Sequence, residues 1–179
     1  MAMRMNEVLL AVLAAGALAL GCSRSEAAPA KKEAPPGNDA VETATAKIDG
    51  KNFKLEIKSA GPCTATTECK GIITLDALSE FHINKEYPYK FTAKVNPDVE
   101  FLGKEGDQAC AGGKTIFSKC AGDFKQEGEQ RATLGFRFKP AKAGPLTVVG
   151  TYKMSVCSAQ NCQLETHELA LDLTVDPKK

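Results

Sequence analysis

Apolar and polar side chains alternate with a period of two over most of the chain from residue 45 onward. This period is typical of β-strands that bury one face and expose the other. The pattern is clear where Phe53, Leu55 and Ile57 are separated by Lys and Glu. It predicts further strands at Tyr87-Tyr89-Phe91-Ala93-Val95, Leu134-Phe136-Phe138, Leu146-Val148 with Tyr152-Met154-Val156, and Leu169-Leu171-Leu173-Val175.

Turn-forming pairs separate these strands. They are Asp49-Gly50, Gly61-Pro62, Asn96-Pro97, Gly112-Gly113, Gly122-Asp123 and Gly144-Pro145. No stretch of this region shows a sustained period of 3.6 residues, the sign of an amphipathic helix. The sequence therefore predicts one all-β domain over residues 45–176, an antiparallel β-sandwich with an irregular excursion at 106–128.

The N-terminal residues predict an export signal. One basic residue, Arg4, precedes an uncharged apolar run at residues 8–20. This run is too short to cross a bilayer as a helix, and it ends in small residues. Residues 18–22 resemble a bacterial lipobox, which implies cleavage after residue 21 and acylation of Cys22, with palmitate among the chains. The alternative is an ordinary signal peptide with an incidental cysteine near its end.

The resemblance to a lipobox also implies a location. Ser23 after the cysteine is similar to the pattern of lipoproteins sorted to the outer membrane, so we expect an outer-membrane lipoprotein that faces the periplasm. Residues 22–44 are rich in Ala, Pro, Lys and Glu and poor in large apolar side chains. Such a composition cannot offset its ordering entropy, which predicts a flexible tether between the lipid bilayer and the domain.

Six further cysteines are expected to form disulfides, because exported proteins fold in an oxidising compartment. The spacing favours local pairing, and cross-pairing between the first two pairs is the main alternative. The three local pairs are Cys63–Cys69, Cys110–Cys120 and Cys157–Cys162. The last pair lies between two strongly alternating strands, at the tip of a predicted final hairpin, where a disulfide is expected to be exposed and open to exchange.

The segment around this last pair resembles a known family. Gly150-Thr-Tyr-x₄-Cys157-Ser-x₃-Cys162, the strand at 169–175 and the stretch Phe81-His-Ile-Asn-Lys-Glu-Tyr-Pro88 are similar to the periplasmic N-terminal domain of the thiol:disulfide interchange protein DsbD. The resemblance implies an immunoglobulin-like sandwich in which Cys157 and Cys162 pass electrons to a thioredoxin-like partner, with Cys162 as the point of attachment. The chain departs from that family in its cysteine spacing and lacks the prolines after the second cysteine.

Other chemistry finds little support. The chain carries a net charge of +1 and no basic patch interleaved with aromatic residues, so we expect no nucleic-acid partner. Hydrolase and phosphate-loop motifs are missing. The only histidines are His82, expected at a strand edge, and His167, expected to face solvent; with Met154 they are poor support for a metal site, and we expect no metal and no cofactor.

These observations lead to one principal hypothesis and one alternative. The principal hypothesis is a membrane-anchored lipoprotein whose disulfide-stabilised sandwich is a non-catalytic binding or structural module. The alternative is a thiol–disulfide oxidoreductase that acts on a periplasmic thioredoxin-like protein through Cys157 and Cys162.

Overall fold

The computed structural model describes residues 44–106 and 110–179. The predicted signal peptide, Cys22 and nearly all of the predicted tether lie outside the described residues. The described part contains eleven strands and no helix, and therefore no helix long and apolar enough to span a membrane. The strands are β1 (Lys47–Asp49), β2 (Phe53–Ser59), β3 (Cys69–Ala77), β4 (His82–Ile83), β5 (Lys90–Ala93), β6 (Val99–Phe101), β7 (Ile116–Ser118), β8 (Phe124–Gln126), β9 (Arg131–Pro140), β10 (Gly144–Cys157) and β11 (Cys162–Val175).

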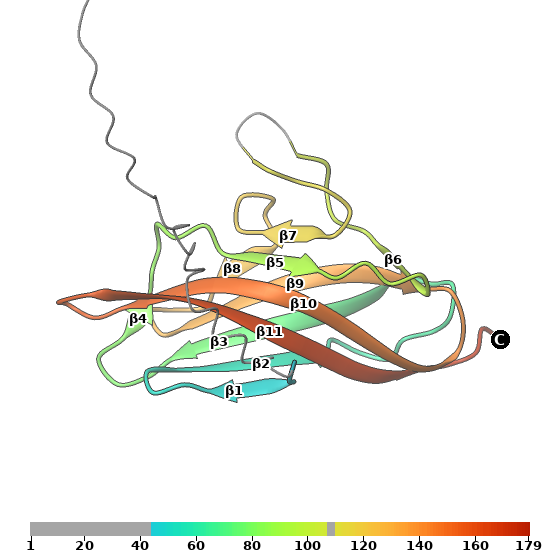
Figure 1. Ribbon diagram of the computed structural model, residues 1–179, viewed down its shortest axis with the longest axis horizontal. Coiled ribbons are helices and arrows are strands. Elements are labelled where there is room, and N and C mark those ends of the chain that lie inside the picture. Colours follow the sequence, from blue (N-terminus) through green and yellow to red (C-terminus); the bar gives the residue numbers. More distant parts are fainter. Residues whose placement is uncertain (1–43, 107–109) are drawn as a thin grey trace, which may run out of the picture. The chain divides into compact units, whose positions relative to one another are not determined.

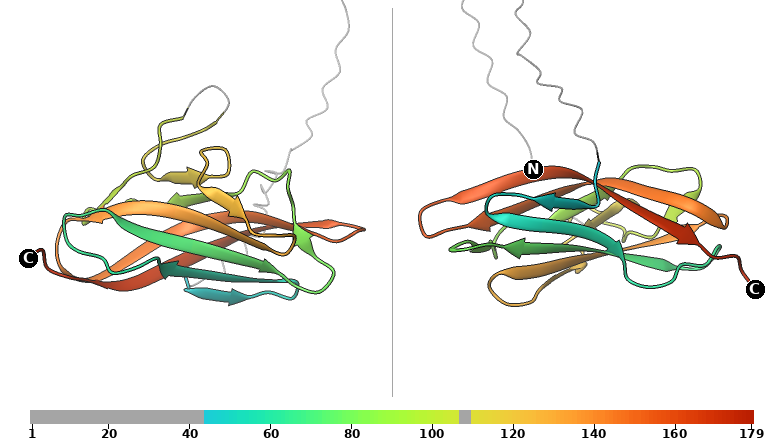
Figure 2. Two further views of the ribbon diagram at one scale, coloured as in Figure 1. Left: turned by 180° about the vertical axis from the view of Figure 1, so that it is seen from behind. Right: turned by 90° about the horizontal axis from the view of Figure 1, so that it is seen from below.

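The strands form two antiparallel sheets packed face to face (Figure 1). The first sheet has the order β1-β2-β3-β9-β6, and β8 also pairs with β9. The second has the order β11-β10-β5-β7, and β4 also pairs with β10. The view from behind and the view from below show the long β10–β11 hairpin running the length of the second sheet (Figure 2). The predicted all-β, immunoglobulin-like sandwich is confirmed.

Alternation along the strands builds the core between the sheets. In β3 the residues Ile73 and Leu75 are fully buried, and their neighbours in sequence point outward. Three aromatic rings contributed by both sheets meet in the centre, where Phe136 packs 5.0 Å from Phe91 and 6.0 Å from Phe117, measured between ring centroids. Burial of such rings is the main source of stability in a domain of this kind.

One glycine is required by this packing. Gly71 of β3 lies directly opposite Phe136 of β9, and a Cβ atom on Gly71 would lie 2.0 Å from the tip of the Phe136 ring. The missing side chain thus leaves the space that the ring occupies.

The excursion at 106–128 is more regular than predicted. Within the predicted irregular excursion, Ile116 and Phe117 belong to β7 and pair with β5, and β8 pairs with β9. Phe117 is fully buried, so hydrophobic burial anchors this segment in both sheets.

The strand predicted at 87–95 is shorter than its alternation suggested. Only Lys90–Ala93 forms β5, and Val95 is 87% exposed. The side chain of Asn96 accepts a hydrogen bond from the backbone N–H of Asp98 at 2.9 Å. This Asx turn directs the chain away from the sheet immediately after Val95, and the Val95 side chain stays exposed.

Candidate functional site

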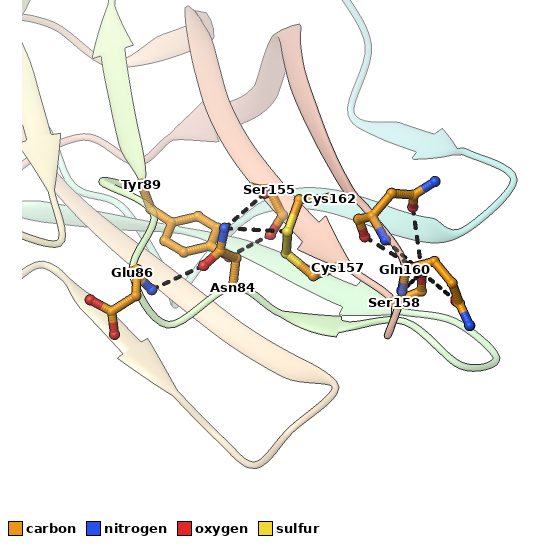
Figure 3. Close-up of a disulfide and its surroundings, with 9 residues drawn as sticks. Asn84, Glu86, Tyr89, Ser155, Cys157, Ser158, Gln160 and Cys162 are labelled. Atoms are coloured by element: carbon orange, nitrogen blue, oxygen red, sulfur yellow. Dashed lines mark hydrogen bonds between the residues drawn. A yellow bond between two sulfur atoms is a disulfide. The ribbon is translucent and has the colours of Figure 1, made fainter.

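The candidate site is the disulfide that closes the β10–β11 hairpin (Figure 3). Cys157 and Cys162 lie directly opposite each other as the last pair of the ladder. The turn between them is held by Ser158, whose hydroxyl accepts hydrogen bonds from the backbone N–H groups of Gln160 at 3.2 Å and Asn161 at 3.3 Å. Serine supplies such local bonds readily, which explains a tight turn without glycine.

The two cysteines of this pair differ in accessibility. Cys162 is exposed, whereas Cys157 is only 5% exposed. Both cysteines were expected to be exposed at the tip, and for Cys157 this prediction is wrong. The cause is β4, which pairs with β10 beside the disulfide and places His82 opposite Cys157.

A small hydrogen-bond network holds the loop after β4 against the disulfide. The Asn84 side-chain amide donates to the Ser155 hydroxyl at 3.2 Å and lies 4.0 Å from the sulfur of Cys162. Its oxygen accepts the backbone N–H of Glu86 at 3.0 Å. The amide therefore links the β4–β5 loop to both strands of the hairpin (Figure 3).

A tyrosine completes this network from the core side. β4 and β5 both pair with β10, but between them the carbonyl of Ser155 has no strand partner. It accepts hydrogen bonds from the hydroxyl of Tyr89 at 2.5 Å and from the backbone N–H of Asn84 at 3.4 Å. Because a buried carbonyl without a partner is costly, Tyr89 stabilises the gap in the ladder. Burial raises the pKa of Tyr89, so its hydroxyl stays protonated and able to donate.

A shallow cleft of about 310 Å³ lies beside this network. It is lined by His82, Ile83, Asn84, Lys85, Gln126 and Glu129. The lining combines one cation, one anion and two amides, with no cysteine or serine within it. The nearby group with a known covalent reaction is the Cys157–Cys162 disulfide, of which Cys162 is the exposed residue.

The cysteines pair locally, as the spacing favoured. The sulfur atoms join Cys63 to Cys69, Cys110 to Cys120, and Cys157 to Cys162. The first bond closes the connection between β2 and β3, and the second joins the two sides of β7. The cross-paired alternative is absent.

The histidines lie apart from each other. His82 is exposed in the short strand β4, as expected. His167 was expected to face solvent, but its side chain is only 12% exposed and packs 5.3 Å from the ring of Phe53, with Nε2 3.5 Å from the Glu165 carboxylate. The inward side of β11 explains the difference, because His167 is paired with the buried Tyr152. Among residues 44–106 and 110–179, no group of three His, Cys, Asp or Glu side chains could hold a metal ion.

Three residues that contribute to the site were not predicted from the sequence, namely Asn84, Tyr89 and Ser155. The alternation of its strand predicts that Ser155 points outward, although it is fully buried. Its burial depends on the β4–β5 loop that folds over it, a contact between segments far apart in the sequence. Asn84 was singled out in the sequence only as part of residues 81–88, which resemble the N-terminal domain of DsbD.

Comparison with known proteins yields similarity of fold alone. Neither a protein-family model nor a curated protein sequence matches the chain. Among solved structures, a cohesin module from a Clostridium perfringens family 33 glycoside hydrolase is 10% identical, with a TM-score of 0.40, and covers 71% of this chain and 98% of its own.

Two further solved structures have the same kind of similarity. AggA, the major subunit of Escherichia coli aggregative adherence fimbriae type I, is 11% identical, with a TM-score of 0.33, covering 71% of this chain and 97% of its own. A PapD-like domain of human CEP192 is 10% identical, with a TM-score of 0.29, covering 74% of this chain and 92% of its own.

Proposed function

We propose that this chain is an envelope lipoprotein, anchored in the outer membrane through acylated Cys22, whose sandwich is a non-catalytic binding module braced by disulfides. The observation that carries the bracing role is the burial of Cys157 between β4 and β11, and the anchor is inferred from the lipobox-like residues 18–22. The bond ties the edge strand β11 to β10, which at this point is paired with both β11 and β4, and so restrains the hairpin tip. Most disulfides of small exported domains have this structural role.

The brace has a measurable size. Cys157 and Cys162 are separated by five positions, and the chain-entropy relation gives about 2 kcal/mol for closing so short a loop. The double variant Cys157→Ser/Cys162→Ser is therefore expected to lose about 2 kcal/mol of unfolding free energy and to keep the fold. Urea denaturation measures the loss. A variant with unchanged stability would contradict the bracing role.

The anchor is tested separately by metabolic labelling with radioactive palmitate. Label on the wild-type chain that is lost in Cys22→Ser supports acylation at this residue. Equal labelling of both chains, or none in either, would contradict the anchor. This experiment does not depend on the role of the sandwich.

The exposure of Cys162 supports a second candidate, a thiol–disulfide exchange module. In its reduced form, the Cys162 thiolate would attack the disulfide of a thioredoxin-like partner, forming a mixed disulfide and releasing one partner thiolate. The Cys157 thiolate would then attack the Cys162 sulfur, which re-forms the intramolecular bond and releases the second partner thiolate. An envelope dithiol reductant would have to restore the reduced pair.

A trapping experiment separates the candidates. In a Cys157→Ser chain, the exchange reaction stops at the mixed disulfide, because the resolving thiol is missing. A covalent adduct with a thioredoxin-like protein that forms through Cys162 and is released by dithiothreitol would support exchange. A chain that forms no adduct while binding a partner non-covalently would support the binding module.

A further inference from the structure

The outer face of the second sheet carries a groove of about 430 Å³, separate from the cleft beside the tip disulfide. Its lining includes two lysines, Lys90 on β5 and Lys153 on β10. Tyr87 and Pro88 of the β4–β5 loop form one wall, and Ser118 and Ala111 lie on the side of β7. The groove thus combines two positively charged side chains with a Tyr87–Pro88 wall and the Cys110–Cys120 disulfide.

The two lysines face each other across neighbouring strands. Lys90 and Lys153 are directly opposite in the β5–β10 register, so their Cα atoms are about 5 Å apart. Like charges in directly opposite positions destabilise a sheet. Neither ammonium has a carboxylate partner within residues 44–106 and 110–179. In contrast, Lys94, the residue directly after β5, pairs with Glu168 at 2.7 Å. This face therefore keeps an uncompensated pair of positive charges.

The wall beside the lysines is aromatic. Tyr87 is half-buried and meets Tyr89 edge-on, with ring centroids 5.3 Å apart. Burial raises the pKa of Tyr87, so its hydroxyl remains a neutral donor at the groove. Tyrosine and proline together offer a rigid surface on which an apolar side chain can pack at low entropic cost.

From the opposed lysine pair and the adjoining Tyr87–Pro88 wall, we propose that this groove binds an extended acidic peptide segment of a partner protein. Carboxylates at positions i and i+2 of an extended peptide lie on one face, about 7 Å apart, a spacing that two flexible lysine side chains can span. An apolar residue next to them would pack on Tyr87. The assignment rests on the proposed binding function and names its ligand class and surface.

A membrane surface and a nucleic acid fit this groove less well. Attraction to anionic lipid typically uses clusters of about four to eight basic residues, and here the lining offers two. Nucleic-acid sites combine an extended basic stripe with several aromatic rings. A concave site with two charges and one apolar wall matches a short peptide better than either polyanion.

The test is fluorescence anisotropy with a fluorescein-labelled peptide of alternating Glu and Leu, added to the full chain carrying Cys22→Ser. The double variant Lys90→Gln/Lys153→Gln is expected to bind this peptide about fivefold to tenfold more weakly, since two exposed charge pairs are lost. A peptide of alternating Gln and Leu should show the same weak binding to both proteins.

The matched control is Lys51→Gln/Lys139→Gln, which removes two exposed lysines that also lack a carboxylate partner in the described chain. It changes the net charge equally and should leave binding within about twofold of the parent. Urea denaturation of both variants checks that they fold. Removing repulsion should leave Lys90→Gln/Lys153→Gln at least as stable as the parent.

Three results would overturn the assignment. They are no binding of the acidic peptide by the parent chain, equal weakening in the two double variants, or binding only to phosphatidylglycerol vesicles with loss in Lys90→Gln/Lys153→Gln. The last result would assign the groove to a membrane surface. If peptide binding fails while palmitate labelling and the stability of the cysteine variant come out as expected, the groove assignment falls and the anchored, braced module stands.

Discussion

Two buried tyrosines offer a matched pair of substitutions with opposite expected effects. Tyr89 and Tyr152 are both fully buried in the second sheet and its loop. The hydroxyl of Tyr89 donates to the Ser155 carbonyl, whereas that of Tyr152 has no hydrogen-bond partner among the described residues. Replacing either residue with phenylalanine removes one oxygen atom and keeps the ring.

The structure sets the expected magnitudes. Tyr89→Phe removes a buried bond of 2.5 Å and leaves Ser155 with only the 3.4 Å contact from Asn84. Losing such a bond and leaving its acceptor poorly satisfied costs about 1.5 kcal/mol. Tyr152→Phe removes an unsatisfied hydroxyl, so its effect is expected between zero and about 1 kcal/mol of added stability.

Urea denaturation followed by far-UV circular dichroism measures both variants. The two unfolding free energies should differ by about 2 kcal/mol, which corresponds to roughly 8 °C between the melting temperatures of a domain of this size. Equal losses in the two variants would refute the reasoning, because they would show that the Tyr152 hydroxyl is as well satisfied as that of Tyr89.

Two further predictions follow from the same core. Burial raises the pKa of both Tyr89 and Tyr152, so the folded state retains phenol protons that the unfolded state loses. The contribution of these two groups to the unfolding free energy should be fully present below about pH 10 and fall above it by about 1.4 kcal/mol per pH unit for each tyrosine. Tyr152→Phe should reduce that slope, which denaturation curves at several alkaline pH values measure. Gly71→Ala places a Cβ against the Phe136 ring and should cost about 1–3 kcal/mol, whereas Gly61→Ala meets nothing within 4 Å and should be nearly neutral; thermal melts of both distinguish the predicted clash from a general effect of alanine.

The architecture was predictable because alternation encodes it locally. The run at Phe53–Ile57 buries every second residue, and the run at Leu169–Val175 buries Leu169, Leu171 and Val175 and half-buries Leu173; each is part of a paired strand. Local turn chemistry was less readable. The alternation predicted that Val95 is buried, but the chain turns at Asn96, the next residue, and Val95 is exposed.

The site depended on contacts that no local pattern encodes. Cys157 was expected at an exposed tip, and its burial comes from β4, which joins β10 from a segment more than seventy positions earlier. The opposed charges of the groove likewise arise only when the register places Lys90 next to Lys153. Local cysteine pairing was predicted correctly because short separations in a hairpin already bring the sulfur atoms together.

The central claim, that the tip disulfide braces a binding module, is tested most directly by the reduction potential of the Cys157–Cys162 pair. The full chain is equilibrated with glutathione buffers, and the alkylated cysteines are identified by mass spectrometry. A structural brace predicts a potential below about −300 mV, resistant to the glutathione pool. A potential more oxidising than about −230 mV would contradict the brace and favour thiol–disulfide exchange.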